Sequence, residues 1–341
     1  MRDTSRSTPA AVTVIMVVML ALAGCAAAPP SPSSLPPPGG TYAVVVGATS
    51  GDLRLVDTRS LTQVGAPIPL RGFPSAVTVS PDGRRAYVIS PTSNSMQVVD
   101  LRTRATVGDP ITVGLYPSAV ALSPGGDRVY VADGESDDVR VFDAAGLRMI
   151  GEPIGTGDAP AGLAVSPDGA RLYVTNQYQN DVRVIDTDAL APVGDPIAVG
   201  AGPAPIAVSP DGSRIYVANL NSDDISVIDT RTNLVVDKPI KVGRYPCALA
   251  ISPDGARLFV ADQVSSDVRA IDTRALRVLP PPAPAGIAPS EIVMNPQGME
   301  AYAVNMYSND LAVIDTQTMA VRRTTTDLGR GPRGVALVTI P

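Results

Sequence analysis

The sequence predicts an all-β protein, a seven-bladed β-propeller with four-stranded blades, closed by the C-terminal strand joining the N-terminal blade. Two repeats predict it: a turn of the Ser-Pro-Asp-Gly type and an Asp that ends a β-type run both recur every 43 residues. A constant period of this length with four β runs per period is typical of propeller blades. The turns begin at Ser80, Ser123, Ser166, Ser209, Ser252 and Asn295, and the Asp positions are Asp57, Asp100, Asp143, Asp186, Asp229, Asp272 and Asp315.

The two ends of the repeat region are expected to share one blade. Residues 43–46 align with residues 86–89, the second strand of the unit, and residues 333–338 align with residues 75–80, its first strand. The N-terminus therefore supplies strands two to four of a blade, and the C-terminus supplies the missing inner strand. This gives 28 strands in seven blades and leaves no unpaired inner edge.

Residues 1–24 are predicted to be a lipoprotein signal peptide. Arg2 and Arg6 precede an apolar run of about a dozen residues, too short for a spanning helix. The run ends in Leu-Ala-Gly-Cys at Cys25, which resembles the bacterial lipobox. The resemblance implies cleavage before Cys25 and a diacylglycerol on its thiol, with acyl chains of the palmitate type. The alternative is an ordinary signal peptide followed by an unrelated Cys.

Residues 25–40 are expected to form a lipidated tether. The stretch 26–40 reads AAAPPSPSSLPPPGG, which favours neither helix nor sheet. At ~3.1 Å per residue in a polyproline II conformation it would reach roughly 45 Å. The propeller domain, residues 41–341, is then extracytoplasmic and anchored to a bacterial membrane only by its N-terminal lipid. Inner and outer membrane both remain open.

Composition excludes several classes of function. The formal net charge is −6, which argues against nucleic acid as a partner because phosphate binding needs clustered Lys and Arg. Histidine is absent, which removes the commonest general base and metal ligand. The only cysteines are Cys25 and Cys247, so no disulfide is expected if Cys25 is lipidated. We expect Cys247 to be a small buried residue, and the protein to be a monomer.

Further repeat marks connect the chain to a known family. Residues 173–176 read Tyr-Val-Thr-Asn, residues 216–219 read Tyr-Val-Ala-Asn, and residues 184–187 read Val-Ile-Asp-Thr. Together with the Ser-Pro-Asp-Gly turn, these marks resemble the YVTN-type β-propeller repeat proteins over residues 41–341. The resemblance implies a propeller at the cell surface or in the periplasm, and only some members are implicated in enzymatic or binding roles.

Most of these marks are expected to be structural. Pro-Asp suits the centre of a type I turn, and the following Gly supplies φ > 0. The Asp that ends the third strand fits an Asx turn. Four prolines in residues 280–284 place the outer strand of blade six at a sheet edge. Aromatic residues are expected between neighbouring blades, where they bury large areas, at Tyr87, Tyr130, Tyr173, Tyr216, Phe259 and Tyr302.

The turns between strands two and three allow two interpretations. Their last Asp is expected to cap the hairpin through backbone N–H groups. Alternatively, the ring of these residues supplies oxygen ligands for Ca²⁺, which takes 6–8 oxygens. They lie on separate blades without an EF-hand spacing, so we predict no metal site and no cofactor, with calcium as the alternative. The positions are Asp52, Ser95, Asp138, Asp181, Asp224, Asp267 and Asp310.

Candidate ligand-binding residues are those that depart from the repeat near the channel mouth. Aromatic or charged side chains precede an inner strand at some blades only, and Glu291 and Arg333 begin the inner strands of two neighbouring blades where the other copies are small or apolar. A mutual salt bridge and contact with a ligand are both open for this pair. The full set is Phe73, Tyr116, Arg244, Tyr245, Glu291 and Arg333.

Two functions of different classes fit these observations. The first is a cell-envelope lipoprotein that acts as a binding or scaffolding module for protein or glycan partners, without catalytic residues. No nucleophile elbow, phosphate loop or dinucleotide fingerprint is present in the sequence. The alternative is a lactonase-like hydrolase that depends on a divalent cation and has its site at the channel mouth.

Overall fold

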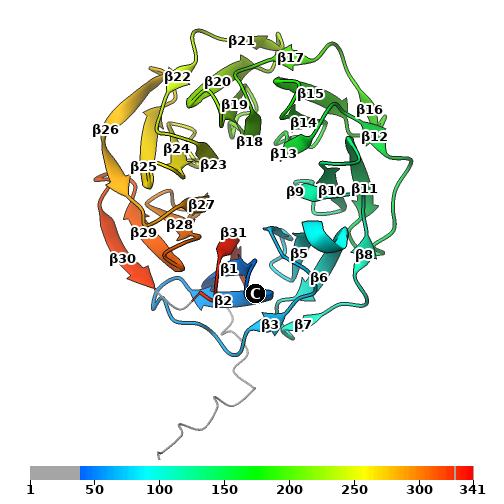
Figure 1. The fold of residues 1–341 in the computed structure, drawn as a ribbon, viewed down its shortest axis with the longest axis vertical. Coiled ribbons are helices and arrows are strands. Elements are labelled where there is room, and N and C mark those ends of the chain that lie inside the picture. The colour runs from blue at the N-terminus through cyan, green and yellow to red at the C-terminus, as the bar shows by residue number, and fades with distance from the viewer. Residues whose placement is uncertain (1–38, 326–327, 341) are drawn as a thin grey trace, which may run out of the picture. The chain divides into compact units, whose positions relative to one another are not determined.

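The computed structural model describes residues 39–325 and 328–340, which form seven antiparallel sheets arranged as blades around a central axis (Figure 1). The inner strands of successive blades contact one another, and the last contacts the first. The predicted all-β, seven-bladed propeller is therefore confirmed. The predicted signal peptide and the lipidation site Cys25 lie outside the described residues.

Blades 1 to 3 follow one another from the N-terminal end. Blade 1 contains β1 (Thr41–Gly47), β2 (Asp52–Asp57), β3 (Ile68–Pro69) and, as its inner strand, β31 (Pro332–Thr339). Blade 2 contains β4 (Ala76–Val79), β5 (Arg85–Ser90), β6 (Ser95–Asp100), β7 (Ala105–Thr106) and β8 (Ile111–Thr112), with the 3₁₀ turn η1 (Pro91–Ser93). Blade 3 contains β9 (Pro117–Leu122), β10 (Arg128–Asp133), β11 (Asp138–Asp143) and β12 (Ile154–Gly155).

Blades 4 to 7 complete the ring. Blade 4 contains β13 (Pro160–Val165), β14 (Arg171–Asn176), β15 (Asp181–Asp186), β16 (Ala191–Pro192) and β17 (Ile197–Ala198). Blade 5 contains β18 (Pro203–Val208), β19 (Arg214–Asn219), β20 (Asp224–Asp229), β21 (Leu234–Val235) and β22 (Ile240–Lys241). Blade 6 contains β23 (Pro246–Ile251), β24 (Arg257–Asp262), β25 (Asp267–Asp272) and β26 (Arg277–Pro284), and blade 7 contains β27 (Pro289–Met294), β28 (Glu300–Asn305), β29 (Asp310–Asp315) and β30 (Val321–Thr325).

The ring closes as the sequence predicts. The C-terminal strand β31 pairs antiparallel with β1, and Val335 lies opposite Val45 while Val338 lies opposite Tyr42. Val335 and Val338 are buried in the hydrophobic clusters on the two faces of blade 1. The first and last strands are thus joined by one backbone ladder, which removes the open edge that a propeller would otherwise have.

The strand number differs from the prediction of 28. The outer strand of blades 2, 4 and 5 is divided into two short pieces, both paired with the third strand. Between the two pieces stands a residue with positive φ, at Gly108 (67°), Gly194 (67°) and Asp237 (63°). A proline follows each of them two residues later and has no N–H for the ladder, so the pairing breaks there.

The repeat marks have the structural roles expected of them. In blade 2 the Gly83 N–H donates to the Ser80 carbonyl over 2.9 Å, and Gly83 has φ 71°, as the turn requires. The Asp229 carboxylate accepts the N–H groups of Arg231 and Thr232 at 3.0 and 2.9 Å, which is the predicted Asx turn. These N–H groups, Thr232 first, lower the pKa of Asp229.

The aromatic side chains that recur in each repeat pack between neighbouring blades. Tyr87 of blade 2 is 1% exposed and packs against Val129 and Phe142 of blade 3. Its hydroxyl donates to the Ala144 carbonyl of the same blade over 3.0 Å. The other five aromatic residues are buried as well, which confirms the predicted packing between blades.

The turns between strands two and three differ from the prediction. Asp181 accepts its hydrogen bond from the side-chain amide of Asn176 at 2.7 Å, and Asp224 and Asp310 likewise accept from an Asn. The residue before this Asp makes the side-chain contact to a backbone N–H. In blade 4 the Asn180 side chain accepts a hydrogen bond from the Gly202 N–H of the next blade at 2.8 Å. These turns therefore connect adjacent blades, and the expected hairpin cap by the last Asp is wrong.

The proline-rich strand β26 lies at the outer edge of blade 6, as predicted, and pairs only with β25. Across residues 39–325 and 328–340, no helix has the length and apolar character needed to cross a membrane.

Candidate active site

A cavity of about 610 Å³ opens at one end of the central channel. We call it the central cavity. Its wall contains residues near the start of all seven inner strands, together with the turns beside them. Most of the strand positions carry Ala, Val, Gly, Leu or Ile, and the only charged side chains in the wall are Glu291 and Arg333.

A bulge at the start of the inner strand places Arg333 in this wall. In blade 1, Val46 pairs with Gly334 and Gly47 pairs with Pro332, so Arg333 is the extra residue of the bulge. Bulges of this kind re-aim a side chain. Ser290 occupies the equivalent position in blade 7, and its hydroxyl donates to the Pro332 carbonyl of the next blade at 3.0 Å. Arg333 makes no hydrogen bond or ion pair with any described residue and is exposed to the cavity.

Glu291 follows the same bulge in blade 7. It lies on β27 opposite Val304, at a position where the other blades have Ala, Gly or Pro. The side chain is half-buried, and the single hydrogen bond to its carboxylate comes from the Ile292 N–H at 3.3 Å. Burial raises the pKa of Glu291 to about 8, because few neighbouring donors compensate for lost hydration of the charged form.

The structure decides one of the alternatives for this pair. Glu291 and Arg333 both line the central cavity, from neighbouring inner strands that contact each other. Within the part of the chain that the structure describes, neither residue belongs to an ion pair, so of the two open alternatives the mutual salt bridge is not formed. Both side chains are left available to a molecule that enters the cavity.

The thiol of Cys247 also lies in the wall and has a structural role. Its Sγ donates to the Pro289 carbonyl of the next blade at 3.0 Å, as the Ser290 hydroxyl does to Pro332. Burial first, and then the nearby Glu291 carboxylate, raise the pKa of Cys247. The thiolate needed for a nucleophile is therefore disfavoured.

The other candidate residues lie on the turns around the mouth. Tyr245 is 37% exposed and lines the central cavity. Phe73, Tyr116 and Arg244 are exposed on equivalent turns but do not contribute to the wall. The structure thus brings together three of the six predicted residues: Tyr245, Glu291 and Arg333.

Two polar turn residues of the wall, Gln263 and Tyr307, were not predicted. Gln263 follows β24 in blade 6, and Tyr307 follows β28 in blade 7. The Gln263 side-chain amide has no hydrogen-bond partner among the described residues, and Tyr307 is 70% exposed. Both belong to turns whose composition varies between blades, and this variation is the signal that could have identified them.

The residues do not fit the metal site of the hydrolase alternative. In residues 39–325 and 328–340, no group of three or more Cys, Asp or Glu side chains is placed to hold a metal ion. The turn residue Asp224 is bonded instead to Asn219 and Lys241, at 2.8 and 2.9 Å. Glu291 and Arg333 are therefore the charged groups available for chemistry in the central cavity.

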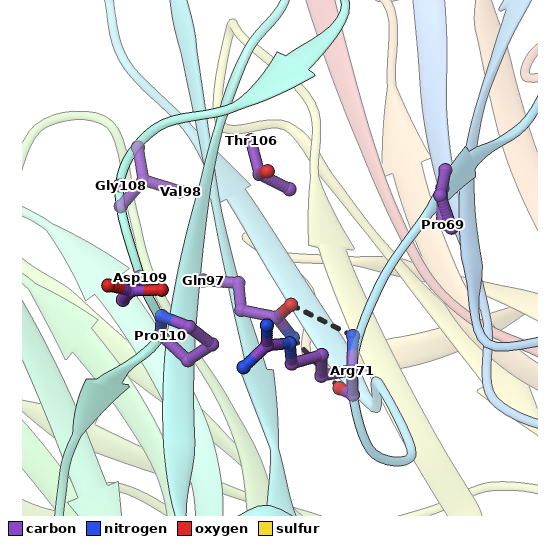
Figure 2. A pocket seen from close by; sticks show the side chains of 8 residues that line it. All are labelled: Pro69, Arg71, Gln97, Val98, Thr106, Gly108, Asp109 and Pro110. Atoms are coloured by element: carbon purple, nitrogen blue, oxygen red, sulfur yellow. Dashed lines mark hydrogen bonds between the residues drawn. The ribbon is translucent and has the colours of Figure 1, made fainter.

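A second, smaller cavity of about 100 Å³ lies near the rim, between the β3–β4 connection and the outer part of blade 2 (Figure 2). The Gln97 side chain crosses it and binds the Arg71 backbone on both sides: its Oε1 accepts from the N–H and its Nε2 donates to the carbonyl, each at 2.8 Å. All polar atoms of the Gln97 amide are thus used to fix a loop, which indicates a structural role for this cavity.

Solved structures with the same fold come from proteins of different names. The hydrazine synthase of Kuenenia stuttgartiensis is 23% identical, with a TM-score of 0.74 over 84% of this chain and 97% of that chain. A putative 6-phosphogluconolactonase from Bacteroides uniformis is 18% identical, with a TM-score of 0.73 over 88% of this chain and 100% of that chain. At these identities the likeness shows the fold alone. No curated protein matches the chain.

The sequence also matches a family model. The model described as "Lactonase, 7-bladed beta-propeller" matches residues 42–147, 145–230 and 163–277, which together extend over more than half of the chain. The seven blades of the structure agree with this description. The chain belongs to the seven-bladed β-propeller lactonase family.

Proposed function

We propose that the protein hydrolyses a lactone in the central cavity, with Glu291 as general base and Arg333 as the group that stabilises the oxyanion. One observation carries the proposal. The only charged side chains of the wall are a carboxyl group and a guanidinium on neighbouring inner strands, and neither is neutralised by an ion pair. Membership of the lactonase family supports a lactone as the substrate.

The reaction needs only these two groups and water. The Glu291 carboxylate takes a proton from a water molecule, whose oxygen attacks the lactone carbonyl carbon. The Arg333 guanidinium donates hydrogen bonds to the negative carbonyl oxygen that develops. The tetrahedral intermediate collapses with cleavage of the ring C–O bond, and the proton passes from Glu291 to the leaving oxygen. Lactone and water thus give the hydroxy acid, and the enzyme returns to its starting state.

Burial prepares Glu291 for this role. A general base is most effective when its pKa lies near the working pH, and the raised pKa of Glu291, about 8, satisfies this condition. Only the ionised form accepts the proton from water. We therefore expect kcat/KM to increase as the pH rises towards 8 and to level off above it.

Substitution of the two residues tests the proposal. We expect Glu291→Gln to lower kcat by about 10²–10⁴-fold and to abolish the limb of the pH profile near 8. We expect Arg333→Met to lower it by about 10²–10³-fold, because the oxyanion loses its donor. Lactone hydrolysis followed by release of acid provides the measurement, with glucono-δ-lactone and δ-valerolactone as substrates.

Matched controls separate this role from a general effect of charge. Glu135 and Arg244 are exposed on turns and do not line the central cavity. Glu135→Gln and Arg244→Met should leave the rate unchanged. Equal activity of Glu291→Gln and the unsubstituted chain would refute the hydrolase and return the binding-module hypothesis to first place.

We also propose that the chain is held at a bacterial membrane by a lipid on Cys25. The described chain enters the ring at Thr41, which pairs with Thr339, whereas Gly47 pairs with Pro332 beside Arg333. The entry point and the central cavity therefore lie at opposite ends of blade 1, so a tether would join the ring at the end remote from the mouth. The mass of the N-terminal peptide tests this: a peptide that begins at Arg2 or Asp3 without added lipid would contradict it.

A further inference from the structure

The polar side chains of the central cavity are gathered on one arc of its wall. Blades 6, 7 and 1 contribute Tyr245, Gln263, Glu291, Tyr307 and Arg333. Blades 2 to 5 contribute small and aliphatic side chains and two serines. A ligand that fits this cavity presents polar groups to one side and an apolar face to the other.

The number of charges limits the charge of the ligand. Arg333 is the only cation of the wall, and the proposed mechanism directs it to the carbonyl oxygen. A phosphate group carries nearly two negative charges and is normally bound by several charged or backbone donors. Two further arginines on mouth turns, Arg244 and Arg330, are exposed and lie outside the wall. Ionised Glu291 would repel a phosphate further.

The free groups of the arc suit hydroxyl groups. The Gln263 amide can donate and accept at once, as two neighbouring hydroxyls of a ring require, and no described residue occupies it. Tyr245 and Tyr307 add phenol groups and exposed ring faces at the mouth. Tyrosine combines an apolar face with a polar tip, which matches the two kinds of surface on a sugar ring.

From this arrangement we infer that the substrate is a polyhydroxylated lactone without a phosphate group, and that Gln263 is the residue that recognises its hydroxyls. The inference rests on the proposed function, because it concerns the same cavity. It adds the class of lactone and a specificity-determining residue.

A comparison of three lactones tests the inference with the full chain. Glucono-δ-lactone, its 6-phosphate and δ-valerolactone share the six-membered ring and differ in hydroxyl groups and charge. For each lactone, the hydrolysis rate of the Glu291→Gln variant is subtracted as background. We expect the resulting kcat/KM for glucono-δ-lactone to exceed the values for its 6-phosphate and for δ-valerolactone by about tenfold or more. Gln263→Leu should remove most of the preference over δ-valerolactone, because kcat/KM for glucono-δ-lactone falls. A preference for the phosphorylated lactone, or equal rates with δ-valerolactone, would overturn the inference.

Binding of the product acids distinguishes failure of the inference from failure of the proposed function. Calorimetry with gluconate and 6-phosphogluconate reports recognition without turnover. Suppose that the chain hydrolyses no lactone but binds gluconate more tightly than 6-phosphogluconate, and that Gln263→Leu weakens gluconate binding. This result would support the ligand class and reject the hydrolase. Tighter binding of 6-phosphogluconate, or no effect of Gln263→Leu, would reject the ligand class.

Discussion

Deletion of residues 332–341 is expected to abolish cooperative folding of the propeller. The deletion removes β31, and β1 then loses the strand with which it pairs from Thr41 to Gly47. Three buried side chains, Val335, Val338 and Ile340, are lost as well. Burial of an aliphatic side chain contributes about 1.5–3 kcal/mol, so the loss is comparable to the whole stability of an ordinary domain. Circular dichroism during thermal unfolding should show a broad transition in place of a single one.

A stabilising variant tests the same closure without loss of the fold. Thr41 and Thr339 are cross-strand partners, and their hydroxyl oxygens lie 3.5 Å apart. Thr41→Cys with Thr339→Cys should form a disulfide that joins the first and last strands. Because the closed loop contains nearly the whole ring, stabilisation of up to about 4–5 kcal/mol is expected. An unchanged midpoint on oxidation, together with normal unfolding of the truncated chain, would contradict the sealed ring.

The repeat made most of the fold predictable. The period of 43 residues predicts the size of each blade, and the alignment of the two termini predicts that the first and last strands share one blade. Both predictions depend on strand pairing that recurs in every unit. The turn at Gly83 and the buried Tyr87 follow from the same logic. The divided outer strands were missed because Gly108 and Pro110 interrupt a ladder that lies at the edge, where little packing constrains it.

The site was only partly predictable, since it depends on departures from the repeat. Glu291 and Arg333 stood out because their equivalents are small, but spacing along the chain cannot show whether two side chains on neighbouring strands meet. The unpredicted residues Gln263 and Tyr307 lie on turns, where a repeat tolerates many residue types. Only the curvature of the ring shows which turn residues face the cavity.

Blades 3 and 6 each contain a pair of facing carboxyl groups, one of them fully buried, and these pairs should make the stability of the protein depend on pH. Asn176 at the end of β14 donates its side-chain amide to Asp181, its cross-strand partner, at 2.7 Å. In blade 3 the same two positions are Asp133 and Asp138, and Asp133 is fully buried. The nearest cation, Arg140 Nε, lies 3.5 Å from Asp133 and 3.4 Å from Asp138. A protonated Asp133 would supply the hydrogen that the amide supplies in blade 4.

Burial is the main cause of the raised pKa of Asp133 and of its equivalent in blade 6, Asp262. It raises the pKa of Asp133 to about 7 and that of Asp262 to about 8, and the facing carboxylates Asp138 and Asp267 add to the effect. In the unfolded chain both groups ionise near pH 4. Between these values the folded state binds more protons, so the free energy of unfolding falls as the pH rises from about 4 towards 8. The slope is at most about 1.4 kcal/mol per pH unit for each group.

Replacement of Asp133 and Asp262 by Asn should remove this part of the pH dependence. Asn presents the donor at every pH, so the double variant should match the unsubstituted chain near pH 4 and exceed its melting temperature by several degrees at pH 8.5. Glu291 titrates in both proteins, and its contribution therefore cancels in the difference. Asp158→Asn, at an exposed turn position, is the control for loss of one negative charge and should show no such growth with pH. A difference between variant and unsubstituted chain that stays constant from pH 4 to 8.5 would show that the two carboxyl groups are ionised in the folded protein, because only a group that gains its proton on folding couples stability to pH in this interval.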